Sequence, residues 1–393
     1  MGIHERKAKP ARLPLSAVGL ALCLAALLLM LCLNPGGDPL SVRMGFSAPE
    51  ALPGREALAL ADELAGAADQ SLQEVSGSLE YVRKAYSLPP DAKAGPAADP
   101  SLFGETADPS VITELLRSPI ARQLIGGQEL TWNEDIEYIP GSSIHYYLDE
   151  TILVLVWQEE AARAVGTFAE VIVSDASQLR RKLVNDTFDA NQYEYATTLS
   201  QQTNAVLALG GDMYDHPSRN NGICVYEGEI LRFEPDTSDS CFFTDTGDML
   251  FAYRYQFETR EEAEAFVKDN KVMFSVCFGP VLIDGGKDVT PMYYTWGEIY
   301  DTYARSAIGQ LGELHYLAMT INCQRPDYNY LANIWQLTDE MLERGCEKAY
   351  ALDGGQTASI IINHELINPV QFGYERFTSD IIYFATAIPE KEA

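Results

Sequence analysis

The sequence predicts an α+β domain built on a mixed, curved β-sheet and tethered by an N-terminal transmembrane helix. Three observations lead to this prediction. A long uncharged apolar run follows a short basic segment at the N-terminus. From residue 151 onward, strand-like apolar runs outnumber amphipathic helical stretches. The two kinds of segment do not alternate regularly, as they would in a parallel α/β fold.

The apolar run predicts a membrane anchor. Residues 1–12 hold Arg6, Lys7, Lys9 and Arg12 against one acidic residue, and residues 13–37 hold no charge. About 20 apolar residues suffice to cross a bilayer as a helix. By the positive-inside rule, residues 1–12 form a cytoplasmic tail, residues 13–35 a single-pass signal-anchor in the cell membrane, and the main domain is extracytoplasmic. A cleaved signal peptide remains the alternative, although its apolar region is usually shorter and ends in a small-x-small site.

Charge and cysteine content exclude several classes of protein. The chain has 28 Lys+Arg against 57 Asp+Glu. Such an acidic surface repels nucleic acid and anionic lipid headgroups, so neither is expected as a partner. The cysteines beyond the anchor are odd in number and form no close CxxC pair, which fits neither a disulfide scaffold nor a zinc site. A Cys224–Cys241 bridge remains open, and no metal or cofactor is predicted.

The region between anchor and main domain divides into two parts. Residues 50–87 predict an amphipathic helix or stalk, because apolar residues from Leu58 to Tyr86 recur with alternating three- and four-residue steps. This helix either packs on its own domain or dimerises through residues 58–86. Residues 88–127 are rich in proline and predict a linker with a short helix. The main domain is then residues 128–390.

Within the main domain, local patterns predict the elements in order. Helices are expected after Asp175 through Leu183, from the Thr259–Glu262 capping box through Val267, and over residues 337–343 with Thr338 at the start. Apolar β-rich runs predict strands over residues 151–157, 169–173, 204–209, 272–278, 315–321, 348–352, 359–363 and 380–385.

Four segments place polar residues and glycines at the ends of apolar strands. Residues 208–216 and 349–357 each run from a strand into an aspartate (Asp212, Asp353) beside paired glycines, which allow a tight turn and close approach to a ligand. Each aspartate either serves a site or bonds its own turn. Asp215 and His216 beside Asp212 are weak evidence for a metal site.

The other two segments are less specific. Residues 278–285 predict a hairpin of strand, rigid turn and strand. In residues 304–309, Arg305 enters an apolar strand. A buried arginine usually has an anionic partner, either a carboxylate or a bound phosphate.

Together these segments, with Arg376-Phe377-Thr378-Ser379-Asp380 near the end, resemble the phosphodiester glycosidase family over roughly residues 144–388. The resemblance implies that family's fold and cleavage of the glycosidic bond of a sugar-1-phosphodiester or related envelope glycan. Asp212 and Asp353 are the expected catalytic carboxylates, and Arg305 and Arg376 the expected contacts to phosphate or to those carboxylates. The expected substrate-binding turn residues are Gly211, Gly354, Gly355, Gln356 and Thr357.

The chain departs from the family pattern at several polar positions. Gly210, Tyr226, Asn322 and Ala351 stand where the family usually has Asn, Arg, Asp and Asn, and the Ser-x-Gly expected near residues 334–336 is absent. Three functions therefore remain. The first is a membrane-anchored extracytoplasmic hydrolase of sugar-phosphate or envelope glycan. The second is a non-catalytic relative that binds cell-surface glycan or a partner protein. The third is an assembly protein working through the 58–86 helix.

Overall fold

Strands dominate the part of the chain that the computed structural model describes, namely residues 86–126, 130, 132–188, 191–213, 221–295, 297–322 and 331–389. These residues fall in one unit, Leu79–Ala393. None of its described helices is long and apolar enough to cross a membrane. The predicted tail, the anchor (residues 13–35) and nearly all of the 50–87 helix lie outside the described residues.

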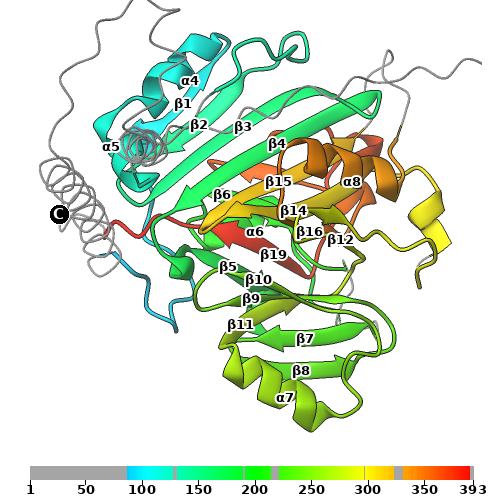
Figure 1. The fold of residues 1–393 in the computed structure, drawn as a ribbon. Helices are drawn as coiled ribbons and strands as arrows, with labels where there is room; N and C mark the ends of the chain where they lie inside the picture. Colours follow the sequence, from blue (N-terminus) through cyan, green and yellow to red (C-terminus); the bar gives the residue numbers. More distant parts are fainter. Residues whose placement is uncertain are drawn as a thin grey trace, which may run out of the picture. The chain divides into compact units, whose positions relative to one another are not determined.

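The large sheet has the strand order β1-β2-β3-β4-β15-β14-β16-β12-β13 (Figure 1). One of its faces is covered by three helices, whose apolar residues pack with Leu153, Leu155 and Trp157 of the sheet. These helices are α4 (Pro109–Leu116), α5 (Pro119–Leu124) and α8 (Ile334–Glu343). The strands are β1 (Phe103–Thr106), β2 (Ile144–Leu148), β3 (Ile152–Ala161), β4 (Ala164–Val173), β12 (Val281–Asp284), β13 (Lys287–Asp288), β14 (Arg305–Gly312), β15 (His315–Asn322) and β16 (Lys348–Leu352).

Two further sheets pack against the opposite face. The β6 sheet has the order β18-β17-β6-β19-β5, and the α7 sheet has the order β10-β9-β11-β7-β8. The β6 sheet consists of β5 (Leu179–Leu183), β6 (Leu207–Gly210), β17 (Ile360–Ile362), β18 (Glu365–Leu366) and β19 (Asp380–Phe384), with α6 (Ala196–Gln202) on its outer side. The α7 sheet consists of β7 (Gly222–Tyr226), β8 (Glu229–Glu234), β9 (Ser240–Thr244), β10 (Met249–Ala252) and β11 (Val272–Val276), with α7 (Arg260–Asp269).

One apolar core joins the three sheets. In β3, Ile152, Val154 and Val156 point into it, while the residues between them face the helices. Because successive side chains of a strand point to opposite faces, a strand covered on both faces is apolar at every position. Phe384 of the β6 sheet and Phe243 of the α7 sheet enter the same core.

The structure has the predicted α+β class, but the details differ in four places. Every strand pair described is antiparallel, in three sheets. The helix expected through Leu183 is only a 3-10 turn, η2 (Ala176–Gln178), capped by Asp175 and followed by β5. Helix α8 starts earlier than expected, with Asn333 as its cap. Residues 278–285 do not form a hairpin, because β11 and β12 belong to different sheets.

The expected linker, residues 88–127, also proves to be part of the folded unit. Leu88 is buried against the β6 sheet, and β1 pairs with β2 at the edge of the large sheet. Arg180 donates hydrogen bonds to the carbonyl oxygens of Pro89 and Ala92, both at 2.6 Å. Tertiary contacts therefore satisfy the polar backbone of a segment whose composition by itself predicts an extended chain.

Candidate functional site

Two of the glycine turns lie side by side. The backbone N–H of Gly210, at the end of β6, donates to the carbonyl oxygen of Ser359 at 3.2 Å. A Cβ atom at position 210 would lie 2.0 Å from the Thr357 carbonyl oxygen. The pairing of β6 with β17 causes this proximity, since β17 directly follows the second turn. Residues 210–212 and 353–359 thus lie against one another.

Asp353, Thr357 and Arg376 form a cluster at the second glycine turn, here called the Asp353 cluster. Its charged side chains are more accessible to solvent than that of Asp212. The Thr357 hydroxyl donates to Asp353 Oδ2 at 2.8 Å. Arg376 Nη2 lies 3.7 Å from the same oxygen, and 36% of the Arg376 side chain is exposed against 11% for Asp353. The cluster thus holds a mostly buried carboxylate beside a partly exposed guanidinium, and the Thr357 hydroxyl orients the carboxylate.

Asp212 lies in a different setting. Its side chain and those of Arg181 and Asp380 have no solvent exposure. Arg181 pairs with Asp380 Oδ2 at 2.5 Å and with Asp212 Oδ2 at 3.4 Å. The pKa of the Asp380 carboxyl is raised to about 6. Burial and the nearby Asp212 raise this pKa, while Arg181 lowers it. Among the described residues, Asp212 Oδ1 has no hydrogen-bond partner.

Arg305 is buried at the start of β14. Its Nε donates to the Ala332 carbonyl oxygen at 3.1 Å and its Nη2 to the Asp301 carbonyl oxygen at 2.8 Å. Next to it, the Gly355 N–H donates to the Ala304 carbonyl oxygen at 2.9 Å. A Cβ at Gly354 would lie 2.3 Å from that same oxygen, so only glycine fits there. These contacts attach the Asp353 turn to β14.

The predicted site residues therefore separate into two groups. The structure brings Asp353, Arg376, Thr357 and the glycine turns together. The charged partner of Asp212 is Arg181, not the expected Arg305 or Arg376. Arg305 donates to two backbone carbonyls and lies over the Tyr303 ring, 5.5 Å from its centroid. Sequence reasoning missed Arg181 because it expected a helix there. Three consecutive basic residues in a region of strands were the available signal.

The positions that depart from the family pattern lie in different surroundings. Gly210 contacts the Thr357 carbonyl, and Ala351 is buried in β16 opposite Ala307 of β14. The side chain of Asn322 is buried and accepts from Asn368 Nδ2 at 3.2 Å. Asn368 also donates to the Ala358 carbonyl oxygen at 2.8 Å, so this amide pair supports the Asp353 turn. Tyr226 instead lines a separate pocket.

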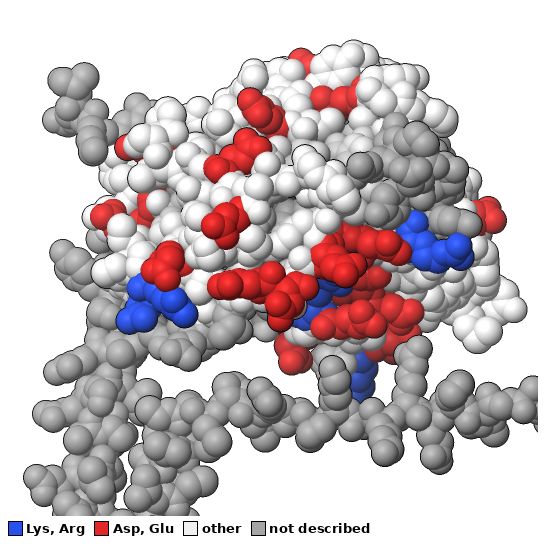
Figure 2. All heavy atoms as spheres, turned by 90° about the horizontal axis from the view of Figure 1, so that it is seen from above, with Lys and Arg blue, Asp and Glu red and all other residues white. Residues whose placement is uncertain are grey.

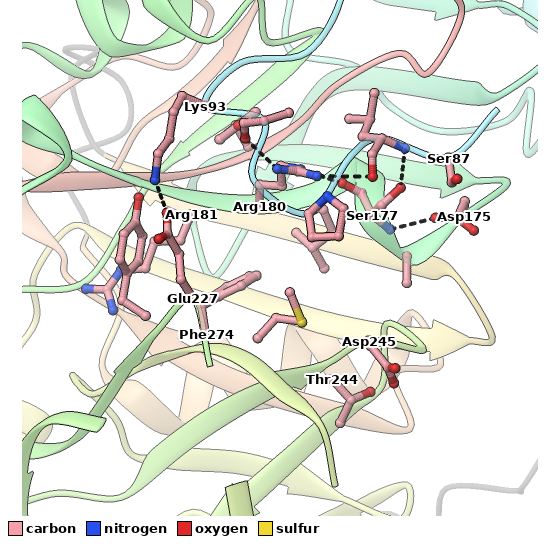
Figure 3. A pocket seen from close by; sticks show the side chains of 18 residues that line it. Ser87, Lys93, Asp175, Ser177, Arg180, Arg181, Glu227, Thr244, Asp245 and Phe274 are labelled. Atoms are coloured by element: carbon pink, nitrogen blue, oxygen red, sulfur yellow. Dashed lines mark hydrogen bonds and ion pairs between the residues drawn. The ribbon is translucent and has the colours of Figure 1, made fainter. Parts of the chain in front are cut away.

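That pocket, of about 450 Å³, lies between residues 87–93, β5 and the α7 sheet (Figure 3). Lys93 pairs with Glu227 at one end. The other carboxylates that line the pocket also have partners. Asp175 accepts from the Ser177 N–H at 2.9 Å, and Asp245 pairs with Lys271 at 3.1 Å. None of the predicted catalytic residues lines it. The Asp353 cluster is therefore the better candidate for glycosidic chemistry.

Cys224 and Cys241 are buried free thiols, so the bridge left open by the sequence is absent between them. Arg181 Nη1 lies 3.5 Å from Cys224 Sγ. A hydrogen bond from Cys277 and the nearby Arg181 lower the pKa of the Cys224 thiol to about 7, although burial opposes them.

Asp215, His216 and Cys323 lie outside the described residues. On the face drawn in Figure 2, acidic side chains far exceed basic ones.

Comparison with known proteins assigns the family. Residues 203–385 match the phosphodiester glycosidase family model. The SPbeta prophage-derived uncharacterized protein YomE of Bacillus subtilis (strain 168) is 20% identical over 246 residues, and the match covers 58% of this chain but only 37% of that protein.

Two solved structures are also similar. The catalytic domain of zebrafish N-acetylglucosamine-1-phosphodiester alpha-N-acetylglucosaminidase matches with a TM-score of 0.47 and 15% identity, covering 60% of this chain and 82% of that one. A hypothetical protein from Synechocystis matches with a TM-score of 0.42 and 13% identity, covering 60% and 62%. The family-model match supports the phosphodiester glycosidase family for residues 203–385 of this chain.

Proposed function

We propose that this protein hydrolyses the glycosidic bond of a sugar-1-phosphodiester or a related envelope glycan at the Asp353 cluster. Water is added across the bond between the sugar C1 and the phosphate oxygen, which yields the free sugar and a phosphate monoester. The observation that carries the proposal is the pair formed by Asp353 and the half-exposed Arg376, held at a glycine turn. Family membership supports the same reaction class.

Each member of the cluster has a chemical role in this proposal. Asp353 is the carboxyl group that moves a proton or attacks C1 as positive charge develops there. The guanidinium of Arg376 is planar and permanently charged, which suits a phosphodiester better than an ammonium would. The Thr357 hydroxyl donates to Asp353 Oδ2 and fixes the orientation of the carboxyl group. The buried Asp212–Arg181–Asp380 network supports the adjoining turn and does not contact substrate.

The test uses the full chain and sugar 1-(4-nitrophenyl phosphates) of several hexoses. Cleavage of the glycosidic bond releases 4-nitrophenyl phosphate, which turns yellow only after phosphatase is added, whereas cleavage of the phosphorus–oxygen bond to the nitrophenyl group releases nitrophenol directly. In water labelled with ¹⁸O, cleavage between C1 and oxygen places the label in the sugar, whereas cleavage of the phosphorus–oxygen bond to the sugar places it in the phosphate. Asp353→Asn is expected to lower kcat by about 10²–10⁴-fold. The matched control is Asp284→Asn, because Asp284 also ends a strand of the large sheet but bonds Tyr253.

The outcomes separate this proposal from its alternative. Phosphatase-dependent colour that Asp353→Asn abolishes supports it, while equal activity of wild type and Asp353→Asn contradicts it. The alternative is a non-catalytic protein that binds glycan, favoured by Tyr226 in place of the family's usual arginine. No turnover of any hexose derivative, together with retained binding of sugar phosphate, would favour that alternative.

We also propose that residues 13–35 anchor the protein in the cell membrane with the catalytic domain outside. The uncharged run behind a basic flank supports this placement. The test is labelling of intact cells with an impermeant thiol reagent after Glu261→Cys, since Glu261 is exposed on α7. Labelling before lysis, above that of the wild-type chain, is expected. Labelling only after lysis would contradict the placement.

A further inference from the structure

Besides Tyr193, which is 37% exposed, four exposed aromatic residues lie on two paired segments beside the Asp353 cluster. They are Tyr195, Phe372, Tyr374 and Phe377, with exposed fractions of 38%, 69%, 65% and 48%. We call these four residues the aromatic platform. The rings of Tyr195 and Phe377 are stacked, with centroids 4.3 Å apart. Single exposed aromatic residues are common, but a group of them indicates a binding surface.

The backbone under the platform is fixed. Glu194 and Thr378 exchange two backbone hydrogen bonds, at 3.0 and 2.8 Å. The Glu375 carboxylate accepts from the Thr197 N–H at 3.0 Å and from the Thr197 hydroxyl at 2.8 Å. These bonds join residues 194–197 to residues 375–378. A rigid surface loses little conformational entropy when a ligand binds.

The platform is continuous with the proposed catalytic residues. Gln356 Nε2, in the glycine turn, donates to the Tyr374 carbonyl oxygen at 3.3 Å. Arg376, which lies between Tyr374 and Phe377 in the chain, extends to within 3.7 Å of Asp353 Oδ2. A ligand whose reacting bond lies at Asp353 would therefore extend over these rings.

We propose that the aromatic platform is a glycan-binding subsite that holds further pyranose units of the substrate, and this inference rests on the function proposed above. The C–H faces of pyranose rings stack on flat aromatic faces, while their hydroxyls remain in water. All large apolar side chains exposed on the described residues 191–197 and 371–378 are aromatic. The continuity of these rings with the Asp353 cluster favours a glycan substrate over a docked protein. The acidic surface makes nucleic acid an unsuitable ligand.

Phe372 permits a test that separates binding from folding. Its φ of 65° lies in the left-handed region, where glycine is unstrained and a phenylalanine is not. Phe372→Gly therefore removes the ring without removing a buried contact. Tyr255 provides a matched control, because it is 72% exposed with a φ of 66° and lies beyond β10 in the α7 sheet.

The experiment titrates the full chain with cellotetraose, chitotetraose and mannotetraose by calorimetry. Wild type should bind at least one of them more tightly than the corresponding monosaccharide. Phe372→Gly and Phe377→Ala should weaken that binding by about tenfold each, the scale of one aromatic contact, while Tyr255→Gly leaves it unchanged. Neither glycine variant should lower the thermal midpoint.

Three results would overturn the proposal: no tetrasaccharide bound by wild type, equal affinity of the platform variants, or the same loss in Tyr255→Gly. Turnover of the short 4-nitrophenyl derivatives is measured in parallel. Turnover without platform-dependent binding would contradict the subsite and support the proposed function. Platform-dependent binding without turnover would contradict the proposed catalysis and support the subsite.

Discussion

Arg181 Nε lies 2.5 Å from Asp380 Oδ2, and neither side chain has any solvent exposure. The two residues lie on adjacent antiparallel strands, β5 and β19, in a diagonal relation, since Asp380 is opposite Leu183 and Arg181 is opposite Ile382. Asp212 shares the same guanidinium from the turn after β6. This buried network joins three strands of the β6 sheet directly behind the proposed site.

Arg181→Met is expected to destabilise the protein by about 3–5 kcal/mol, because it leaves two carboxylates buried without their cation. The measurement is the free energy of unfolding in urea. Arg260→Met is the control, since Arg260 forms an exposed pair with Glu264 and should cost less than about 1 kcal/mol. Equal losses in the two variants would show that the network contributes no more than a surface pair.

The stability should depend on pH through Asp380. Its pKa in the folded protein is about 6, against an ordinary value of 3.8. Between these values the folded state keeps a proton that the unfolded state releases, so the free energy of unfolding falls as the pH rises. The full change is about 2–3 kcal/mol. Urea midpoints from pH 4 to 7 should show this fall in wild type and lose most of it in Asp380→Asn; parallel curves would contradict the assignment.

Gly210→Ala is expected to destabilise the protein by about 1–3 kcal/mol, because the new methyl group would press on the Thr357 carbonyl and displace the Asp353 turn. The larger asparagine that the family usually has there should not raise activity above that of the wild type. Gly312→Ala is the control, since a Cβ there meets no atom within 4 Å. Thermal unfolding of both variants measures the difference, and a stable Gly210→Ala protein would refute the steric argument.

Thr357→Val tests how Asp353 is held. The valine keeps the shape but loses the hydroxyl that bonds Asp353 Oδ2. A hydrogen bond to a charged group contributes about 1.5–3 kcal/mol, so kcat should fall by about 10–100-fold. Thr357→Ser should recover most of this loss. Thr246→Val, which removes a surface bond to Asp248, should leave kcat unchanged. A rise in KM or a loss of stability, with kcat unchanged, would indicate a structural role instead.

Local patterns predicted many elements correctly. The capping box of Thr259 and Glu262 starts α7, and the apolar runs that end at Leu209, Leu352 and Ile362 are strands. These signals are local because caps and alternating side chains involve only neighbouring residues. The prediction failed at residues 179–183, because Asp175 caps only a short 3-10 turn and not the longer helix expected from it. There the opposite charge lies on another strand, nearly two hundred residues away in the chain.

The sequence by itself determined the family, the α+β class, and the Asp353 turn with its paired glycines, since these depend on local motifs and composition. Only the tertiary structure decided which charges pair, because ion pairs form between strands that the chain order does not bring together. It assigned Arg181 to Asp212 and Asp380, and Arg376 to Asp353. In the structure, residues 88–126 also pack onto the sheets, because the buried backbone groups of that segment form hydrogen bonds with neighbouring elements.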